Sequence, residues 1–184
     1  MEIYLDNSAT TQVSPTVAEF VCHMMTENYG NPSSLHRKGF IAEQALTAAR
    51  GQVARVMGAR SDEITFTSCG SEANNLALLG GCHGARRRGN KLITTAVEHP
   101  SILHAAEALE REGFTVVRIM PSASGGVSPE AVANEVDDAT VMVSVMHVNS
   151  ETGSINDIAA IAAAVRRKNS NTLLHSDCVQ SFCK

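Results

Sequence analysis

This sequence of 184 residues lacks several features that would place it in a special class of protein. Aromatic residues make up only 4% of it, so its core must be built mainly from Ala, Val, Ile and Leu. No stretch approaches the roughly 20 consecutive apolar residues that span a bilayer, and the N-terminus lacks the basic and apolar regions of a signal peptide. The five cysteines are an odd number without a CxxC pair, which fits neither a disulfide framework nor a zinc site. We therefore expect reduced thiols and a cytoplasmic protein.

A strong excess of one charge is also missing. The net charge is −4, which gives no reason to expect a nucleic-acid or membrane partner. The arginine triplet at residues 86–88 is interpreted as a solvated helix end, because a lone basic triplet in an acidic chain is poor evidence for nucleic-acid binding. Apolar residues make up 43% of the sequence, and its length suffices for one domain with its own core.

Helical and strand patterns alternate along the chain. Helices are predicted to begin at Pro15, Ser71, Pro100 and Pro129, to end at Gly58, and to cover 158–165. Strands are predicted at 63–67, 91–97, 114–120, 140–148 and 172–176. These strands are apolar without alternation and are separated by helices, which predicts an α/β fold of three layers with a mostly parallel sheet. The first 30 or so residues precede this alternation and are expected to pack as an arm.

Ligands of such sheets bind beyond the carboxyl ends of the strands, which points to the loops at 67–72, 97–101, 147–153 and 176–181. In the first loop, Gly70 lets the backbone approach a ligand, Ser71 offers a hydroxyl, and the following helix presents free N–H groups. This combination predicts an anion site suited to a phosphate, although an ordinary helix cap is the alternative. Neither GxGxxG nor GxxxxGK[ST] is present, so the usual dinucleotide and triphosphate fingerprints are missing.

The other three loops carry polar groups that are compatible, one at a time, with ordinary caps and turns. They contribute His99, then Asn149 and Ser150, and finally Asp177 and Gln180. Together, a phosphate cradle, a flat imidazole, a carboxylate and an amide suit a planar phosphorylated cation. Pyridoxal phosphate is such a molecule, because its electron-sink chemistry needs a protonated pyridine ring.

Seven motifs stand in order along the chain: YLDNSATT (4–11), YGNPSSLH (29–36), ITFTSCGSEANN (64–75), EHPSIL (98–103), VSVMHVNSETG (143–153), DIAAI (157–161) and HSDCVQSFCK (175–184). Together they closely resemble those of cysteine desulfurases, which are class V, fold-type I pyridoxal-phosphate enzymes. The resemblance implies an amino-terminal arm at 1–15, on the small-domain and dimer side. It also implies a partial cofactor-binding large domain at 16–184, incomplete at its C-terminus.

The resemblance implies a role for individual residues. Gly70 and Ser71 would bind the cofactor phosphate, His99 would stack on the pyridine ring as the catalytic histidine, Asp177 would pair with the ring nitrogen, and Gln180 would face the phenolic oxygen. No metal ligand is implied. Near the substrate pocket and the dimer interface would lie Ala9, Thr10, Asn31, His36 and Asn149.

The family converts L-cysteine to L-alanine and leaves a persulfide that supplies sulfur for iron–sulfur clusters. The resemblance therefore implies L-cysteine as substrate, a homodimer, and sulfur-acceptor or scaffold proteins as partners, with no nucleic acid and no membrane.

Two positions depart from the family pattern. Ser150 stands where the family has a second asparagine, which weakens a contact to the cofactor oxygen and the substrate carboxylate. A serine hydroxyl could still act there through water. Cys183 stands where the family has glycine. Overpacking or the loss of a special backbone angle is the alternative at this position, but we expect a small buried thiol.

The Schiff-base lysine of the family follows a Ser-Gly-His stretch, and no lysine of this sequence does. None of the five cysteines matches the persulfide position; Cys69 comes closest, beside a helix N-terminus. We therefore expect an amino-terminal part of a desulfurase that binds pyridoxal phosphate weakly or not at all and is inactive by itself. The four lysines are Lys38, Lys91, Lys168 and Lys184, of which the last matches a non-catalytic lysine of the family.

Two alternatives remain open at this stage. The chain could be a truncated paralogue that acts as a binding or scaffold partner of a full-length desulfurase. It could also derive from a selenocysteine lyase or another class V enzyme, since these share the general cofactor cradle.

Overall fold

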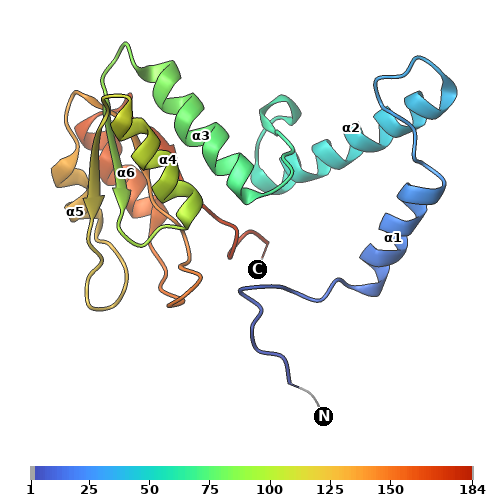
Figure 1. Cartoon of the computed structure of the whole chain (residues 1–184), viewed down its shortest axis with the longest axis horizontal. Coiled ribbons are helices and arrows are strands. Elements are labelled where there is room, and N and C mark those ends of the chain that lie inside the picture. The colour runs from blue at the N-terminus through green and yellow to red at the C-terminus, as the bar shows by residue number, and fades with distance from the viewer. Residues whose placement is uncertain (1–2, 184) are drawn as a thin grey trace. The chain divides into compact units, whose positions relative to one another are not determined.

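The computed structural model describes residues 3–183 (Figure 1). Residues 1 and 2 of the predicted arm, and Lys184, lie outside the described residues. The chain divides between Phe66 and Thr67 into two compact units, each described by itself. The domain boundary predicted after residue 15 stays a prediction.

The described residues of the first unit form two α-helices and one turn of 3-10 helix. Helix α1 (Pro15–Thr26) begins where the Ser14 hydroxyl accepts a hydrogen bond from the backbone N–H of Val17, with proline in the first helical position. Helix α2 (Arg37–Met57) ends at Gly58, whose φ of +63° suits a glycine. Both ends agree with the sequence patterns. The unit closes with η1 (Ser61–Glu63).

The prediction of a strand at 63–67 is wrong. Ile64 has extended backbone angles, φ −97° and ψ 124°, but no strand of the described chain pairs with 64–67. The carbonyl oxygen of Ile64 instead accepts a hydrogen bond from the guanidinium of Arg50. A strand is defined by its neighbour, so an apolar extended segment without a partner does not become one.

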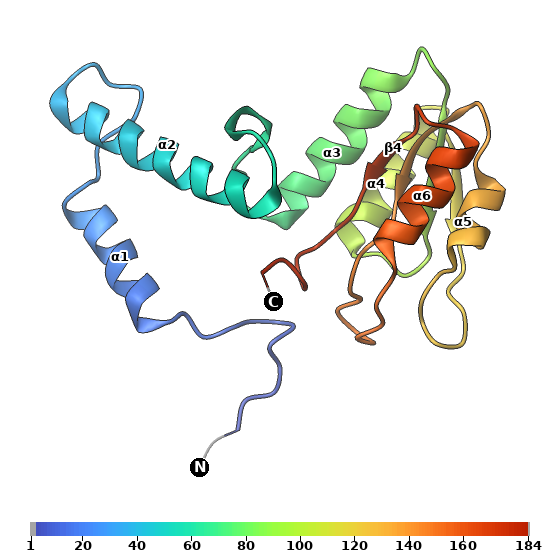
Figure 2. The ribbon, with the colours of Figure 1, turned by 180° about the vertical axis from the view of Figure 1, so that it is seen from behind.

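The second unit is a four-stranded parallel sheet in the order β2-β1-β3-β4 (Figure 2). Its strands are β1 (Lys91–Thr95), β2 (Thr115–Ile119), β3 (Thr140–Ser144) and β4 (Leu173–His175). Its helices are α3 (Gly70–Ala85), α4 (Pro100–Arg111), α5 (Pro129–Glu135) and α6 (Ile158–Lys168).

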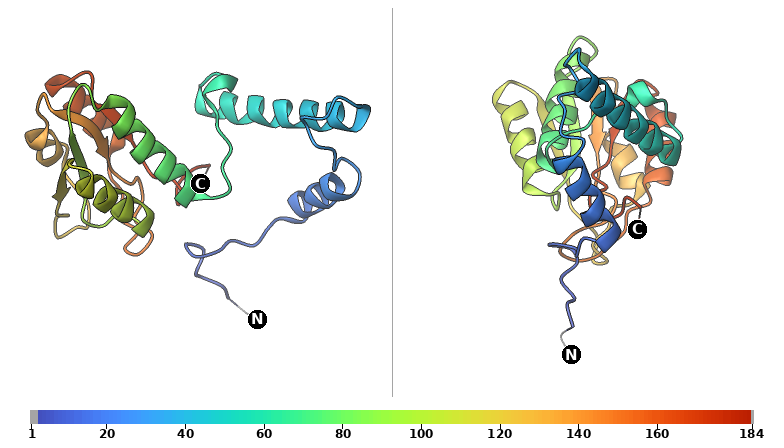
Figure 3. Two further views of the ribbon diagram at one scale, coloured as in Figure 1. Left: turned by 45° about the horizontal axis from the view of Figure 1, so that its top comes forward. Right: turned by 90° about the vertical axis from the view of Figure 1, so that its right-hand side faces the viewer.

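Helices cover both faces of this sheet, seen from two further sides in Figure 3. Leu92 and Met142 pack into a core cluster with α3 and α4 on one face. Their chain neighbours Ile93 and Val143 point the opposite way and pack with α5 and α6. All of β3 is buried. These observations confirm the predicted α/β fold with a mostly parallel sheet in three layers.

Among residues 3–183, no helix is both long enough and apolar enough to cross a membrane.

Candidate active site

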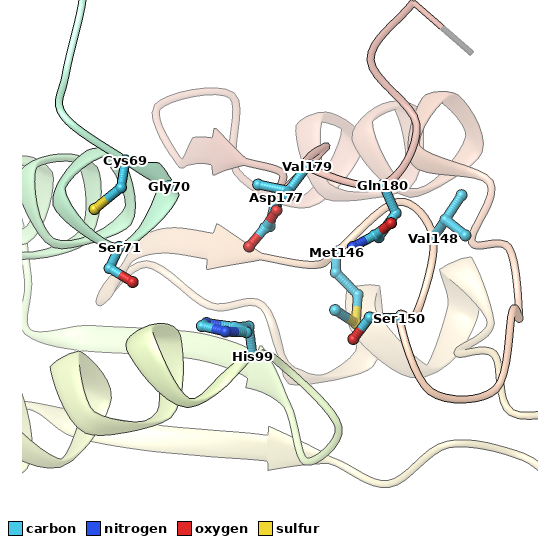
Figure 4. A pocket seen from close by; sticks show the side chains of 10 residues that line it. All are labelled: Cys69, Gly70, Ser71, His99, Met146, Val148, Ser150, Asp177, Val179 and Gln180. Carbon is cyan, nitrogen blue, oxygen red and sulfur yellow. Dashed lines mark hydrogen bonds between the residues drawn. The ribbon is translucent and has the colours of Figure 1, made fainter. Parts of the chain in front are cut away.

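A cavity of about 180 Å³ opens at the carboxyl edge of the sheet (Figure 4). All four loops named by the sequence pattern contribute to it. Its lining residues are Cys69, Gly70, Ser71, His99, Met146, Val148, Ser150, Asp177, Val179 and Gln180. The structure thus brings together six predicted residues: Gly70, Ser71, His99, Ser150, Asp177 and Gln180.

The N-terminus of α3 forms one end of this cavity. Glu72 does not occupy it, because its Oε2 turns back to accept hydrogen bonds from the backbone N–H and the hydroxyl of Ser68, both at 2.6 Å. Cys69 precedes the helix. The pKa of its thiol is lowered mainly by the backbone N–H of Glu72 and, to a smaller extent, by the Ser68 hydroxyl. The helix end therefore favours a negative charge. At Gly70, an added Cβ would lie 3.0 Å from Cγ2 of Val179, so a side chain would crowd the cavity wall.

His99 lies at the junction of β1 and α4. Its Nδ1 accepts a hydrogen bond from the backbone N–H of Ser101 at 3.2 Å and lies 2.8 Å from the Ser101 hydroxyl, so the imidazole caps the helix while remaining exposed to the cavity. Figure 4 shows the imidazole and the Asp177 carboxylate on opposite sides of the same space.

Asp177 follows β4 and is buried, with 9% of its surface exposed. Its Oδ1 accepts from the backbone N–H of Val179 at 3.0 Å, and its Oδ2 accepts from Nδ2 of Asn74 at 2.8 Å. No ion pair formed within residues 3–183 includes this carboxylate. A buried carboxylate without a cation is costly, so the site suits a ligand that brings a positive charge.

Two neighbouring residues in the turn after β3 lie in different environments. Ser150 lines the cavity, whereas Asn149 is buried. The Asn149 amide donates to the carbonyl oxygen of Val97 at 2.9 Å and accepts from the backbone N–H groups of Glu151 and Thr152, each at 2.9 Å. Asn149 thus braces two loops of the site, and its predicted place on the substrate side stays a prediction.

Glu98 does not line the cavity, but it is a buried carboxyl beside the site that the sequence reasoning missed. Its Oε1 accepts hydrogen bonds from the hydroxyl of Thr95 at 2.8 Å and from the backbone N–H of Met146 at 3.0 Å. Its Oε2 is buried without a hydrogen-bond partner among the described residues. Burial raises the pKa of this carboxyl to about 7, against the effect of those hydrogen bonds, and the charge of Asp177 adds to the rise. Its place directly before His99 was the one available signal.

Two further histidines tie the ends of β3 and β4 together. Nδ1 of His175 lies 2.9 Å from the hydroxyl of Ser144, and Nδ1 of His147 lies 2.9 Å from that of Ser181. Burial lowers the pKa of His175, only partly opposed by the Asp177 charge, so its ring is neutral near pH 7.

The remaining predicted residues lie in the first unit. Thr10 Oγ1 shares a hydrogen bond of 2.7 Å with the Tyr4 hydroxyl, Asn31 Oδ1 accepts from the Ser33 backbone, and His36 caps α2 through Nδ1. Ala9 belongs to a turn whose N–H bonds back to Asp6. The roles of Ala9, Thr10, Asn31 and His36 stay predictions.

The expectation of a buried thiol at Cys183 is wrong. Cys183 is exposed and has a φ of +61°. This left-handed conformation is the physical reason why a glycine suits the position, since a Cβ is strained there.

Comparison with known proteins agrees with this geometry. Residues 3–184 match the family model described as aminotransferase class-V. The cysteine desulfurase IscS of Clostridium botulinum (strain Kyoto / Type A2) is 42% identical over 181 residues, covering 98% of this chain and 45% of the relative. The cysteine desulfurase IscS of Pseudomonas fluorescens (strain SBW25) is 45% identical over 187 residues, covering 100% of this chain and 46% of the relative.

Among solved structures, a NifS-like protein has a TM-score of 0.94 and 37% identity, over 98% of this chain and 50% of that one. The structure titled SspA in complex with cysteine has a TM-score of 0.92 and 34% identity, over 98% and 52%. This chain therefore spans about half the length of the relatives it matches, and its fold corresponds to part of theirs.

Proposed function

This chain belongs to the class-V aminotransferase family, and on that premise we propose that it forms the pyridoxal-phosphate cradle of a cysteine desulfurase. Pyridoxal phosphate is the cofactor of the family. One observation carries the proposal: a single cavity joins an anion-favouring helix N-terminus to a buried carboxylate that has no cation among the described residues. The similarity to two cysteine desulfurases supports the choice of reaction.

The α3 end of the cavity fits a phosphate group. Gly70 and Ser71 would hold it through backbone N–H groups and the Ser71 hydroxyl, since no side chain among residues 3–183 makes a capping hydrogen bond at this helix end. The side chain of Glu72, the one acidic group in the first turn, is already bound to Ser68. The backbone N–H of Glu72 also lowers the pKa of the Cys69 thiol, as expected where a helix N-terminus stabilises an anion.

The opposite side of the cavity fits a protonated pyridine ring. Asp177 would hold the proton on the ring nitrogen, since both its oxygens already accept hydrogen bonds and its charge lacks a cation. His99 would lie against the ring, and Gln180 and Ser150 would approach its oxygen substituent from the strand ends. When bound, the cofactor would supply an electron sink for the substrate. Met146, Val148 and Val179 would exclude water from this chemistry.

The proposed reaction converts L-cysteine and an enzyme thiol to L-alanine and an enzyme persulfide. The carbon–sulfur bond of the substrate and the sulfur–hydrogen bond of the enzyme thiol break, and a sulfur–sulfur bond forms between the two sulfur atoms. The proton lost by the enzyme thiol balances the proton that the β-carbon of alanine gains. The persulfide would pass to acceptor proteins for iron–sulfur cluster assembly. The complex of the neighbour SspA with cysteine supports the substrate class.

We propose that the 184-residue chain does not perform this reaction by itself. Among residues 3–183, no lysine lines the cavity. Nζ of Lys91 is bound to Asp137 at 2.9 Å and to the carbonyl oxygen of Glu135, and Nζ of Lys38 is bound to the carbonyl oxygen of Glu27 at 2.9 Å. Covalent catalysis needs an activated lysine and a thiolate in reach of the substrate. Alanine released from L-cysteine should therefore equal that of a control with cofactor alone; turnover above this control would refute the proposal.

Cofactor binding is the direct test. Pyridoxal phosphate is titrated into the chain by equilibrium dialysis, alongside pyridoxal and inorganic phosphate. We expect saturable binding that phosphate competes for and that pyridoxal does not reproduce. Asp177→Asn should weaken it at least tenfold, whereas the exposed control Glu107→Gln should not change it. No saturable binding below about 1 mM, or equal binding by both variants, would contradict the proposed cradle.

A partner protein belongs to the same proposal. Helix α1 has no buried residue, although Val17, Phe20, Val21 and Met25 are apolar and exposed. An apolar face of this kind is typical of an interface, and we propose that a second desulfurase chain covers it. Light scattering should detect an assembly that Phe20→Glu dissociates; a monomer at all concentrations would argue against it and against the scaffold alternative alike.

We also propose a cytoplasmic location, supported by the five cysteines, all free.

A further inference from the structure

Two buried residues outside the predicted site connect two residues inside it. Asn74 lies on α3 with 5% of its surface exposed, and Ser101 lies on α4 with 9% exposed. Nδ2 of Asn74 lies 3.0 Å from the Ser101 hydroxyl and 2.8 Å from Oδ2 of Asp177. The Ser101 hydroxyl lies 2.8 Å from Nδ1 of His99. A continuous chain of hydrogen bonds therefore runs from the carboxylate to the imidazole.

The direction of each bond in this chain follows from the chemistry of its groups. The amide nitrogen of Asn74 only donates, and its two protons serve Ser101 and Asp177. The opposite orientation of the amide would set its oxygen against the carboxylate, an arrangement of two acceptors. The Ser101 hydroxyl accepts from Asn74 and therefore has its own proton available for His99.

The backbone of Ser101 settles the state of the imidazole. Its N–H lies 3.2 Å from Nδ1 of His99, and a backbone N–H can only donate. Nδ1 is therefore an acceptor towards both groups of Ser101, and the proton of the neutral ring resides on Nε2. At the other end, both oxygens of Asp177 accept hydrogen bonds, as suits an ionised carboxylate.

We propose that Asn74 and Ser101 are positioning residues, which fix His99 in one tautomer and one orientation relative to the ionised Asp177. This deepens the proposed function, since His99 and Asp177 would then meet a pyridine ring from its face and its edge in a fixed geometry. Neither Asn74 nor Ser101 lines the cavity. Their effect on a ligand passes through His99 and Asp177. Because Asn74, Ser101 and Asp177 are buried, breaking any of these hydrogen bonds costs free energy, which makes the series of hydrogen bonds rigid.

Nitrogen NMR of the cofactor-free chain, labelled in its histidines, tests the proposal without any activity. In Ser101→Ala, Nδ1 of His99 loses a hydroxyl donor, so its resonance should move towards that of an unbonded nitrogen, and Ser101→Thr should restore it. Ser144→Ala is the matched control, because Ser144 makes the equivalent contact to His175. It should move the His175 resonance and leave His99 in place. An unmoved His99 in Ser101→Ala, or one that moves equally in Ser144→Ala, would overturn the proposal.

A second experiment tests the connection to the carboxylate. Asp177→Asn should displace the Nδ1 resonance of His99, and Ser101→Ala should reduce this displacement at least twofold, because the path through Ser101 is then cut. An equal displacement in both backgrounds would show that only the field through space acts, which would overturn the proposed chain.

Pyridoxal-phosphate titration separates this inference from the proposed function. We expect Ser101→Ala to weaken binding about fivefold, as the loss of one hydrogen bond does, with recovery in Ser101→Thr. If no protein binds the cofactor while the NMR shifts occur as expected, the cradle is wrong and the positioning of His99 stands. If binding occurs equally in all variants and the NMR shifts are absent, the cradle stands and the positioning role is wrong.

Discussion

Glu98 offers the sharpest test of the electrostatics of this site. Its carboxyl is buried against the end of β1 and the segment after β3, with two donors on Oε1 and none on Oε2 among the described residues. The substitution Glu98→Gln keeps the shape of the side chain and removes its ability to ionise. Comparing the two proteins across pH isolates the cost of placing a charge there.

The pKa of Glu98 determines the sign and the size of the effect. Burial raises the pKa of this carboxyl from 4.5 to about 7. A carboxyl whose pKa is higher in the folded state stabilises the fold fully below pH 4.5, and that stabilisation is lost as the pH rises to 7. At about 1.4 kcal/mol for each tenfold difference in proton affinity, the loss is about 3 kcal/mol. This is a large part of the total stability of about 5–15 kcal/mol for a domain.

Urea denaturation at a series of pH values between 4.5 and 8 measures the loss. The free energy of unfolding of the wild type, relative to Glu98→Gln, should fall by about 3 kcal/mol over this range and level off above pH 7. The control is Glu107→Gln on the exposed side of α4, whose difference from wild type should show no such step. Parallel curves for wild type and Glu98→Gln would refute the reasoning, because they would mean that the carboxyl ionises as easily in the fold as in the unfolded chain.

Three further predictions concern backbone strain, the cavity wall and a buried histidine. Cys183→Gly should raise the free energy of unfolding by about 1 kcal/mol, because it relieves a φ of +61°, whereas Cys22→Gly inside α1 should lower it by a similar amount. Gly70→Ala should weaken pyridoxal-phosphate binding about tenfold, because its Cβ meets Val179; dialysis of the double variant with Val179→Ala should show recovery, and equal affinities throughout would contradict this. Burial lowers the pKa of His175 below 6.5, so the contribution of its neutral ring to stability is present above that pH and is lost as the pH falls. The urea midpoint should therefore decrease less between pH 6.5 and 5 in His175→Gln than in the wild type.

Local sequence signals were sufficient for most of the elements and for the place of the site. The pairs Ser14-Pro15 and Ser128-Pro129 begin α1 and α5, and Gly58 ends α2, because caps act within one turn of the helix. Apolar runs separated by helices specified a parallel sheet, since only a sheet covered on both faces accommodates them. Knowing that ligands meet the carboxyl ends of such strands was then enough to bring His99 and Asp177 to one cavity.

The failures concern properties that depend on residues distant in the chain. The segment at 64–67 has the composition of a strand, but it has no neighbouring strand among the described residues. The sequence carried no signal for the burial of the Asn149 amide, which contacts Val97 and its own turn. Cys183 was expected to be buried, although its exposure and backbone angle depend on how the chain turns after β4.

The sequence by itself determined the order of helices and strands, the parallel sheet and the edge that carries the site, because these follow from periodicity and capping over a few residues. Only the tertiary structure decided which polar groups are buried and what they bond to. The link from Asn74 on α3 to Asp177 after β4, and the solvent-excluded carboxyl of Glu98, exist because packing brings distant segments together and removes water from between them. Hydrogen-bond partners and desolvation are properties of that arrangement in space, and no local pattern encodes them.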